Sequence, residues 1–158
     1  EMKDVLTSVR VMTEEGEIME LPAEKLGLGY RTSIIPEKRY IVLGAVISLT
    51  EGKKEEIKAQ MDDFRQKRVS KQPLEYPSAG STFKRPEGYF AGKLIQDSGL
   101  KGFTVGGAQV SEKHSGFVIN KGNATAADVM ELIRQVTAKV KEDTGVTMEP
   151  EVKQIGEF

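Results

Sequence analysis

The sequence contains no cysteine and only one histidine, His114. Without cysteine, the chain can form no disulfide, no thiolate metal site and no thiol nucleophile. A single histidine in a chain without thiols gives no support to a catalytic zinc site or to a Ser-His triad. The absence of cysteine is compatible with a reducing compartment such as the cytoplasm.

Long apolar runs and a strong net charge are also missing. The longest apolar stretch, residues 40–49, is interrupted by Gly44 and is far shorter than the roughly 18 residues of a membrane span. No basic segment followed by an apolar one opens the chain, so we expect no secretory signal. The net charge of −1 gives no reason to expect nucleic acid or an anionic membrane as a partner. Local cations would therefore have to hold any anionic ligand.

The composition is that of a folded protein, with 38% hydrophobic and 30% charged residues in a chain of 158. A chain of this length can bury a core as one domain, or as one domain and part of another. Residues up to about Thr50 are dominated by strand patterns. Residues 5–12 and 17–21 flank a glycine-containing turn and predict a hairpin, and residues 40–49 predict a long strand. A short helical turn is expected after Pro22.

From Gly52 onward the periodicity of the apolar residues becomes helical. Helices are predicted over residues 53–69, 89–98 and 125–145, and strands over residues 107–111 and 117–120 and from Val146. Thr125 and Gly145 are the cap and the terminator of the last helix. Its inward face is expected to consist of Val129, Leu132, Ile133, Val136 and Val140. We expect the apolar faces of the segments after Gly52 to form one core. The interleaved elements predict the α+β class, as an α/β sandwich.

The most informative stretch is residues 77–86, which combine two prolines, a glycine, three small hydroxyl residues and two cations. The prolines restrict the residues before them to extended geometry, and Gly80 permits conformations closed to other residues. A rigid turn that presents the Ser81 hydroxyl, with Lys84 and Arg85 close by, is expected. Composition alone favours an ordinary surface turn.

Five blocks of sequence resemble the UDP-N-acetylenolpyruvoylglucosamine reductase family, whose members are flavoenzymes that complete UDP-N-acetylmuramate for peptidoglycan. In order, the blocks are Gly29–Ser33, Ala79–Pro86, Ala91–Gln96, Val110–Asn120 and Met148–Gly156. One block could occur by chance, whereas five in the family's order indicate membership. Some members insert a tyrosine-bearing loop between the first two blocks, and this chain resembles the branch without it.

The resemblance implies that the chain is the C-terminal part of such an enzyme. Residues 1–51 would be a remnant of the FAD-binding domain, residues 52–146 the substrate-binding domain, and residues 147–158 a C-terminal strand with the catalytic glutamate. The implied cofactors are FAD and NADPH, with most of the flavin-binding residues upstream and unassigned. The implied protein is a cytoplasmic monomer that acts on a nucleotide sugar.

The resemblance also implies three catalytic residues. Ser81 matches the family's proton donor, Arg31 its activating arginine and Glu151 its catalytic glutamate. The planar guanidinium of Arg31 suits a carboxylate or an enolate. From the residues alone, Arg31 could instead form a surface salt bridge, and Glu149 is a near twin of Glu151.

The substrate-binding residues implied by the resemblance are Tyr30, Lys71, Lys84, Arg85 and His114. Lys71 matches a lysine near the substrate diphosphate, although a solvated lysine is equally consistent with the sequence. Arg85 stands where some members carry asparagine. His114 stands where a glutamine contacts substrate in some members, and a structural hydrogen bond is its alternative role.

Two other functions stay open. The chain could be a non-catalytic module that binds nucleotide sugars, or a structural interaction domain without a common pocket at these positions. The presence of Arg31, Ser81 and Glu151 together favours the enzyme. The pair of glycines around Leu28 lacks the third glycine and the preceding strand of a dinucleotide fingerprint.

Overall fold

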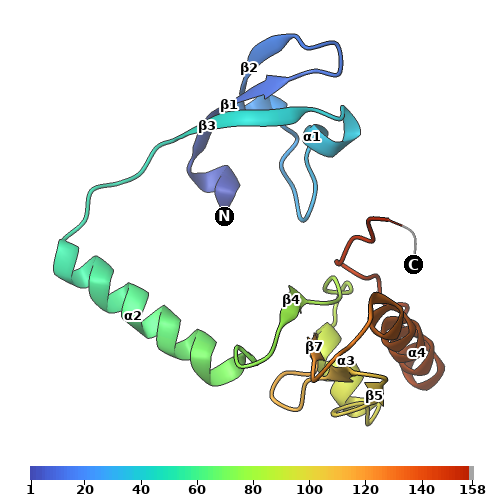
Figure 1. Ribbon diagram of the computed structural model, residues 1–158. Coiled ribbons are helices and arrows are strands. Elements are labelled where there is room, and N and C mark those ends of the chain that lie inside the picture. Colours follow the sequence, from blue (N-terminus) through green and yellow to red (C-terminus); the bar gives the residue numbers. More distant parts are fainter. Residues whose placement is uncertain (157–158) are drawn as a thin grey trace. The chain divides into compact units, whose positions relative to one another are not determined.

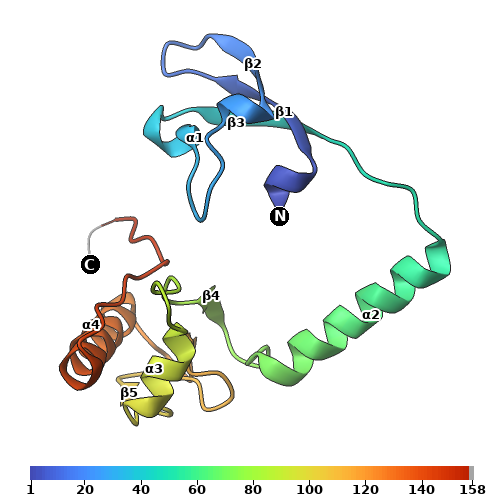
Figure 2. The ribbon, with the colours of Figure 1, turned by 180° about the vertical axis from the view of Figure 1, so that it is seen from behind.

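The computed structural model describes residues 1–156, which form two compact units (Figures 1 and 2). The first unit is Glu1–Ile57 and the second begins at Lys58, within one long helix. No helix in residues 1–156 is both long enough and apolar enough to cross a membrane.

The first unit is built on a three-stranded antiparallel sheet with the strand order β2-β1-β3. Its elements are the 3-10 helices η1 (Met2–Asp4) and η2 (Ala23–Lys25), the strands β1 (Leu6–Met12), β2 (Ile18–Pro22) and β3 (Ile41–Ile47), and the short helix α1 (Ile34–Glu37). The predicted hairpin is confirmed, because Met12 pairs with Ile18 and Gly16 takes a φ of +85° in the turn. The helical turn after Pro22 and the long third strand are confirmed as well.

The core of the first unit is small and leaves one strand largely uncovered. Val9, Val11 and Leu26 are buried at its centre. All seven residues of β3 are exposed or only half-buried, including Val42 and Val46 at 50% and 54% exposure. In residues 1–156, β3 pairs only with β1, so its other edge has no strand beside it.

The second unit packs helices against a four-stranded antiparallel sheet with the order β4-β7-β6-β5. Its elements are α2 (Lys54–Lys71, which starts in the first unit), β4 (Ser78–Ser81), α3 (Ala91–Asp97), β5 (Thr104–Val105), β6 (Ala108–Val110), β7 (Phe117–Asn120) and α4 (Ala126–Thr144). The predicted helices and the strands β6 and β7 are confirmed. The short strand β5 was not predicted, and Gly106 and Gly107 form the turn of the β5–β6 hairpin. The α+β class is confirmed.

Helix α4 provides most of the helical side of the core. The Thr125 hydroxyl accepts a hydrogen bond from the Asp128 N–H, and the Asp128 carboxylate accepts one from the Thr125 N–H. These reciprocal bonds satisfy amide groups that the first helical turn leaves open. Gly145 ends the helix at a φ of +73°. The predicted inward face packs against the sheet, with four residues fully buried and one partly buried, namely Leu132, Ile133, Val136, Val140 and Val129.

The long helix α2 does not join this core, so the prediction of one core for all segments after Gly52 is wrong there. None of its residues is buried, and Ile57, Met61 and Phe64 are 47%, 65% and 59% exposed. Three apolar residues make a stripe too narrow to bury the helix, and the other faces are charged. Ion pairs one turn apart, such as Lys58–Asp62, support its helical conformation instead.

The predicted C-terminal strand is wrong in extent. In residues 146–156 only a single bridge forms, between Pro150 and Phe83. The pairing passes Pro150, because the Lys84 N–H donates to the Glu149 carbonyl and the Glu151 N–H donates to the Thr82 carbonyl, but it does not extend into a regular strand within residues 146–156. Residues 157 and 158, the last two of the predicted strand, lie outside the described residues.

Candidate active site

Ser81 lies at the end of strand β4, with its side chain exposed. The structure shows a short strand here where the sequence predicted a rigid turn. Ser78 pairs with Ile119 and Ser81 with Phe117, so β4 carries one more residue than β7 between the two pairs. Gly80 takes a φ of +83° within this β-bulge, in a region that favours glycine. The bulge therefore sets the direction in which Ser81 leaves the strand.

Thr82 follows Ser81 and is only 2% exposed. Its N–H donates to the Gly116 carbonyl at 2.9 Å, and its hydroxyl accepts from the Val118 N–H at 3.0 Å. Its carbonyl accepts from the Glu151 N–H at 2.8 Å. One residue thus connects the serine motif, strand β7 and the C-terminal segment. Sequence analysis did not single out Thr82, although alternation along a strand places it on the face opposite Ser81.

The C-terminal segment lies along the serine motif through two backbone hydrogen bonds. The Lys84 N–H donates to the Glu149 carbonyl at 2.8 Å, and the Glu151 N–H donates to Thr82 as described. These bonds flank the bridge between Phe83 and Pro150. The structure therefore brings the backbones of the two predicted catalytic residues of this unit, Ser81 and Glu151, to either side of Thr82.

The two neighbouring glutamates differ in their surroundings. The Glu149 carboxylate forms an ion pair with the Lys84 ammonium group, and the Glu149 side chain is 70% exposed. Glu151 is half-buried. The sequence alone could not show how the surroundings of these two glutamates differ. In the structure, the Glu149 carboxylate is paired with Lys84 of the serine motif.

Arg85 and His114 are each held by local contacts. The Arg85 Nε donates to the Tyr89 carbonyl at 3.2 Å, and the guanidinium lies 4.0 Å from the centre of the Phe90 ring. The Nδ1 atom of His114 accepts a hydrogen bond from the Gly116 N–H at 3.1 Å, and its ring meets the edge of Phe117. If His114 is neutral, its proton therefore resides on Nε2. The structural hydrogen bond left open by the sequence exists, and contact with substrate stays a prediction.

The remaining predicted residues are exposed. Lys71 is the last residue of α2. Tyr30 and Arg31 form the tip of a tight turn in the first unit, closed by two backbone hydrogen bonds between Gly29 and Thr32. The Arg31 guanidinium lies 5.3 Å from the centre of the Tyr30 ring. Arg31 takes a φ of +56°, which is uncommon for a residue with a side chain and is found at functional sites more often than elsewhere.

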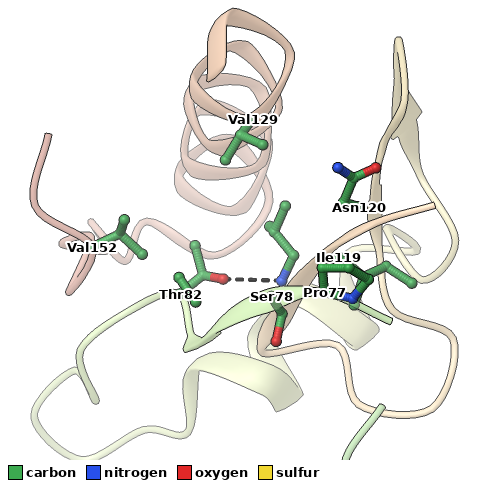
Figure 3. A pocket seen from close by; sticks show the side chains of 9 residues that line it. Pro77, Ser78, Thr82, Ile119, Asn120, Val129 and Val152 are labelled. Carbon is green, nitrogen blue, oxygen red and sulfur yellow. Dashed lines mark hydrogen bonds between the residues drawn. The ribbon is translucent and has the colours of Figure 1, made fainter. Parts of the chain in front are cut away.

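A cavity of about 340 Å³ lies behind the serine motif (Figure 3). Val129 of α4, Val118 of β7 and Val152 of the C-terminal segment line it together with Thr82. Figure 3 also shows the hydrogen bond that the Thr82 hydroxyl accepts. The lining is mostly apolar, and Ser81 is not part of it. The cavity therefore adjoins the segments that carry Ser81 and Glu151, and it was not predicted from the sequence.

Comparison with known proteins gives a consistent result. A family model described as "UDP-N-acetylenolpyruvoylglucosamine reductase, C-terminal domain" matches residues 72–155. Two curated proteins named UDP-N-acetylenolpyruvoylglucosamine reductase are similar to this chain. The one from Agathobacter rectalis is 62% identical over 100% of the chain, and the one from Lachnoclostridium phytofermentans is 60% identical over 99% of it. The chain spans 50% and 51% of their lengths, or about half.

A solved structure is similar to nearly the whole chain. The crystal structure of the UDP-N-acetylenolpyruvylglucosamine reductase from Thermus caldophilus matches with a TM-score of 0.81 and 38% sequence identity. The match covers 96% of this chain and 53% of that one.

Proposed function

Because the chain belongs to the UDP-N-acetylenolpyruvoylglucosamine reductase family, we propose that it forms the C-terminal half of an enzyme of peptidoglycan precursor synthesis. The proposed reaction is the NADPH-dependent reduction of UDP-N-acetylglucosamine enolpyruvate to UDP-N-acetylmuramate. The 62% identity over the whole chain carries this proposal. In this view residues 1–51 belong to the flavin-binding domain and residues 52–146 to the substrate-binding domain, with the catalytic glutamate after them.

The reaction adds a hydride to the vinyl carbon of the enolpyruvyl group and a proton to the carbon next to the carboxylate. FAD reduced by NADPH supplies the hydride when it is bound. As the hydride arrives, the electron pair of the double bond moves onto the adjacent carbon and is delocalised into the carboxylate as an enolate. The protein must stabilise that charge and deliver a proton to the correct face.

In the part of the chain that the structure describes, no loop between a strand and a helix carries the three glycines of a dinucleotide fingerprint. The proposal therefore leaves the flavin-binding residues unassigned.

Ser81 is the proposed proton donor. Its hydroxyl proton passes to the carbanionic carbon, and solvent returns a proton to the alkoxide afterwards. A hydroxyl is a weak acid, so this transfer requires a strongly basic carbon and nearby positive charge. The exposed position of Ser81 at the end of β4 leaves its hydroxyl open to a ligand.

Arg31 and Glu151 are proposed to stabilise the enolate. The planar guanidinium of Arg31 can make two parallel hydrogen bonds to a carboxylate or an enolate. Glu151 in its protonated form could donate a hydrogen bond to the developing charge. The choice of Glu151 over its neighbour Glu149 rests on the match to the family's catalytic glutamate.

The nucleotide-sugar substrate is proposed to bind through Tyr30, Lys71, Lys84, Arg85 and His114. A diphosphate needs cations, and the chain's net charge of −1 supplies no general attraction, so local lysine and arginine side chains must provide it. Stacking on Phe90 presents the Arg85 guanidinium as a fixed plane.

The alternative is a non-catalytic module that binds nucleotide sugars. Steady-state kinetics of the full-length protein distinguishes the two. The proposal predicts that NADPH oxidation depends on UDP-N-acetylglucosamine enolpyruvate and yields one UDP-N-acetylmuramate per NADPH consumed. Binding of the substrate without coupled NADPH oxidation would instead identify the module.

A further inference from the structure

The buried hydroxyl of Thr82 satisfies an amide group of a neighbouring strand. Val118 is 7% exposed, and a buried backbone N–H requires an acceptor. At the β-bulge of β4 the ladder to β7 is interrupted, and the Thr82 Oγ1 atom accepts from the Val118 N–H at 3.0 Å. A side-chain oxygen thus does here what a strand carbonyl does in a regular ladder.

The backbone of the same residue is fixed at both ends. Its N–H donates to the Gly116 carbonyl at 2.9 Å, and its carbonyl accepts from the Glu151 N–H at 2.8 Å. Ser81 directly precedes Thr82 in the chain, and the Glu151 N–H is hydrogen-bonded to the Thr82 carbonyl. Any rotation of Thr82 would therefore move both predicted catalytic residues of the second unit.

We propose that Thr82 is a positioning residue, whose hydroxyl holds Ser81 and Glu151 in their relative places by anchoring the bulged strand to Val118. The effect of Thr82 on catalysis rests on the proposed function, because it requires that Ser81 and Glu151 be catalytic. Its structural part stands on the three hydrogen bonds alone. Thr82 itself is buried and lies on the face of the strand opposite Ser81.

The test compares two substitutions in the full-length reductase. Thr82→Val keeps the shape but removes the acceptor, whereas Thr82→Ser keeps the acceptor. Stopped-flow measurements follow flavin reduction by NADPH and then oxidation of the flavin by substrate. A misplacement near 1 Å can slow catalysis about 100-fold, so Thr82→Val should slow the second half-reaction by about 10- to 100-fold. Flavin reduction should be unchanged, kcat should fall more than KM rises, and Thr82→Ser should keep near-normal rates.

A matched control is available in the first unit. Thr13 is also buried, and its hydroxyl accepts from the Glu17 N–H at 3.3 Å in the β1–β2 hairpin. Thr13→Val removes the same kind of hydrogen bond at a position distant in sequence from Ser81 and Glu151. It should therefore leave the second half-reaction unchanged. Equal losses in the Thr13 and Thr82 valine variants would overturn the proposal.

Amide exchange in the chain itself tests the structural part without relying on enzyme activity. Thr82→Val should raise the exchange rate of the Val118 N–H by about 10-fold or more, and Thr82→Ser should not. Unchanged exchange overturns the inference, and so does faster exchange with normal kinetics. If the valine variant does not fold, Thr82→Ala against Thr82→Ser gives the same comparison. A wild-type protein without reductase activity would contradict the proposed function, and amide exchange would still test the anchor.

Discussion

The ammonium group of Lys84 forms an ion pair with the carboxylate of Glu149, and the backbones of the same two residues are joined by a hydrogen bond. This double connection attaches the C-terminal segment to the serine motif. The Glu149 side chain is 70% exposed, so the ion pair itself is expected to contribute no more than about 1 kcal/mol to stability. The two glutamates that the sequence presents as equivalents also differ in burial, because the Glu149 side chain is largely exposed and Glu151 is half-buried.

The first prediction follows from that distinction. Glu151→Gln in the full-length reductase should lower the rate of substrate reduction by about 10²–10⁴-fold, because a positioned acid is lost. Glu149→Gln serves as the control and should change the free energy of unfolding by less than about 1 kcal/mol, with substrate reduction within a few-fold of normal. Single-turnover kinetics of both variants measures this. The reverse ranking would assign the catalytic role to Glu149.

The second prediction concerns the core. Ile133 is 3% exposed, so Ile133→Ala should lower the free energy of unfolding by about 2–5 kcal/mol. Met61 on α2 is 65% exposed, and Met61→Ala should stay within about 0.5 kcal/mol of the wild type. Urea unfolding of the chain provides the measurement. A loss below about 0.5 kcal/mol for Ile133→Ala would contradict the packing of α4.

These two helices show how far the sequence could predict the fold. For α4 the periodicity, the cap at Thr125 and the terminator at Gly145 all agree, and the helix forms as expected with its predicted face inward. For α2 the periodicity correctly predicts a helix but not its burial. Spacing decides which side chains share a face, whereas burial depends on what else packs against that face.

The sequence predicted the segments that make up the candidate site but not the hydrogen bonds that join them. The serine and glutamate motifs were recognisable from the sequence, but their contact through Thr82 depends on a β-bulge and on a bridge at Pro150. Both features are set by pairing between segments distant in sequence, which no local pattern encodes. The left-handed conformation of Arg31 could not be predicted either, because glycine and asparagine are the residues that usually adopt it.

The third prediction concerns the cofactor. The chain spans about half the length of its relatives and carries no dinucleotide fingerprint, so we expect it to bind FAD no more tightly than about 10 μM. The full-length protein should purify with bound flavin. Fluorescence titration of FAD with each protein makes the comparison. Binding tighter than about 10 μM by the chain alone would show that its own residues suffice.

The fourth prediction tests Ser81 as the proton donor. In the full-length reductase, Ser81→Ala should leave electron transfer from NADPH to flavin nearly intact, because that half-reaction needs no proton from the serine. Reduction of the enolpyruvyl substrate should slow by about 10²–10⁴-fold or more. Stopped-flow absorbance resolves the two half-reactions. Equal slowing of both, or of neither, would rule out this role for Ser81.

The last prediction uses the conformation of Arg31 to separate its backbone from its side chain. At a φ of +56° a residue with a Cβ atom bears a cost of about 1–2 kcal/mol that glycine avoids, partly offset by the greater freedom of glycine in the unfolded chain. Arg31→Gly and Arg31→Ala both remove the guanidinium, so both should lose most of the second half-reaction. The alanine variant should nevertheless unfold with a free energy about 0.5–1 kcal/mol lower than the glycine variant.

Arg31→Lys completes this series, because lysine keeps the positive charge and has the same free-energy cost of a Cβ atom at positive φ. A point charge cannot reproduce two parallel hydrogen bonds, so Arg31→Lys should also slow substrate reduction while flavin reduction stays normal. Chemical denaturation gives the stability order, and stopped-flow absorbance gives the rates. Equal stability of the alanine and glycine variants would contradict the turn conformation. Full activity of the lysine variant would show that charge alone suffices at this position, and that the planar fork of arginine is not required.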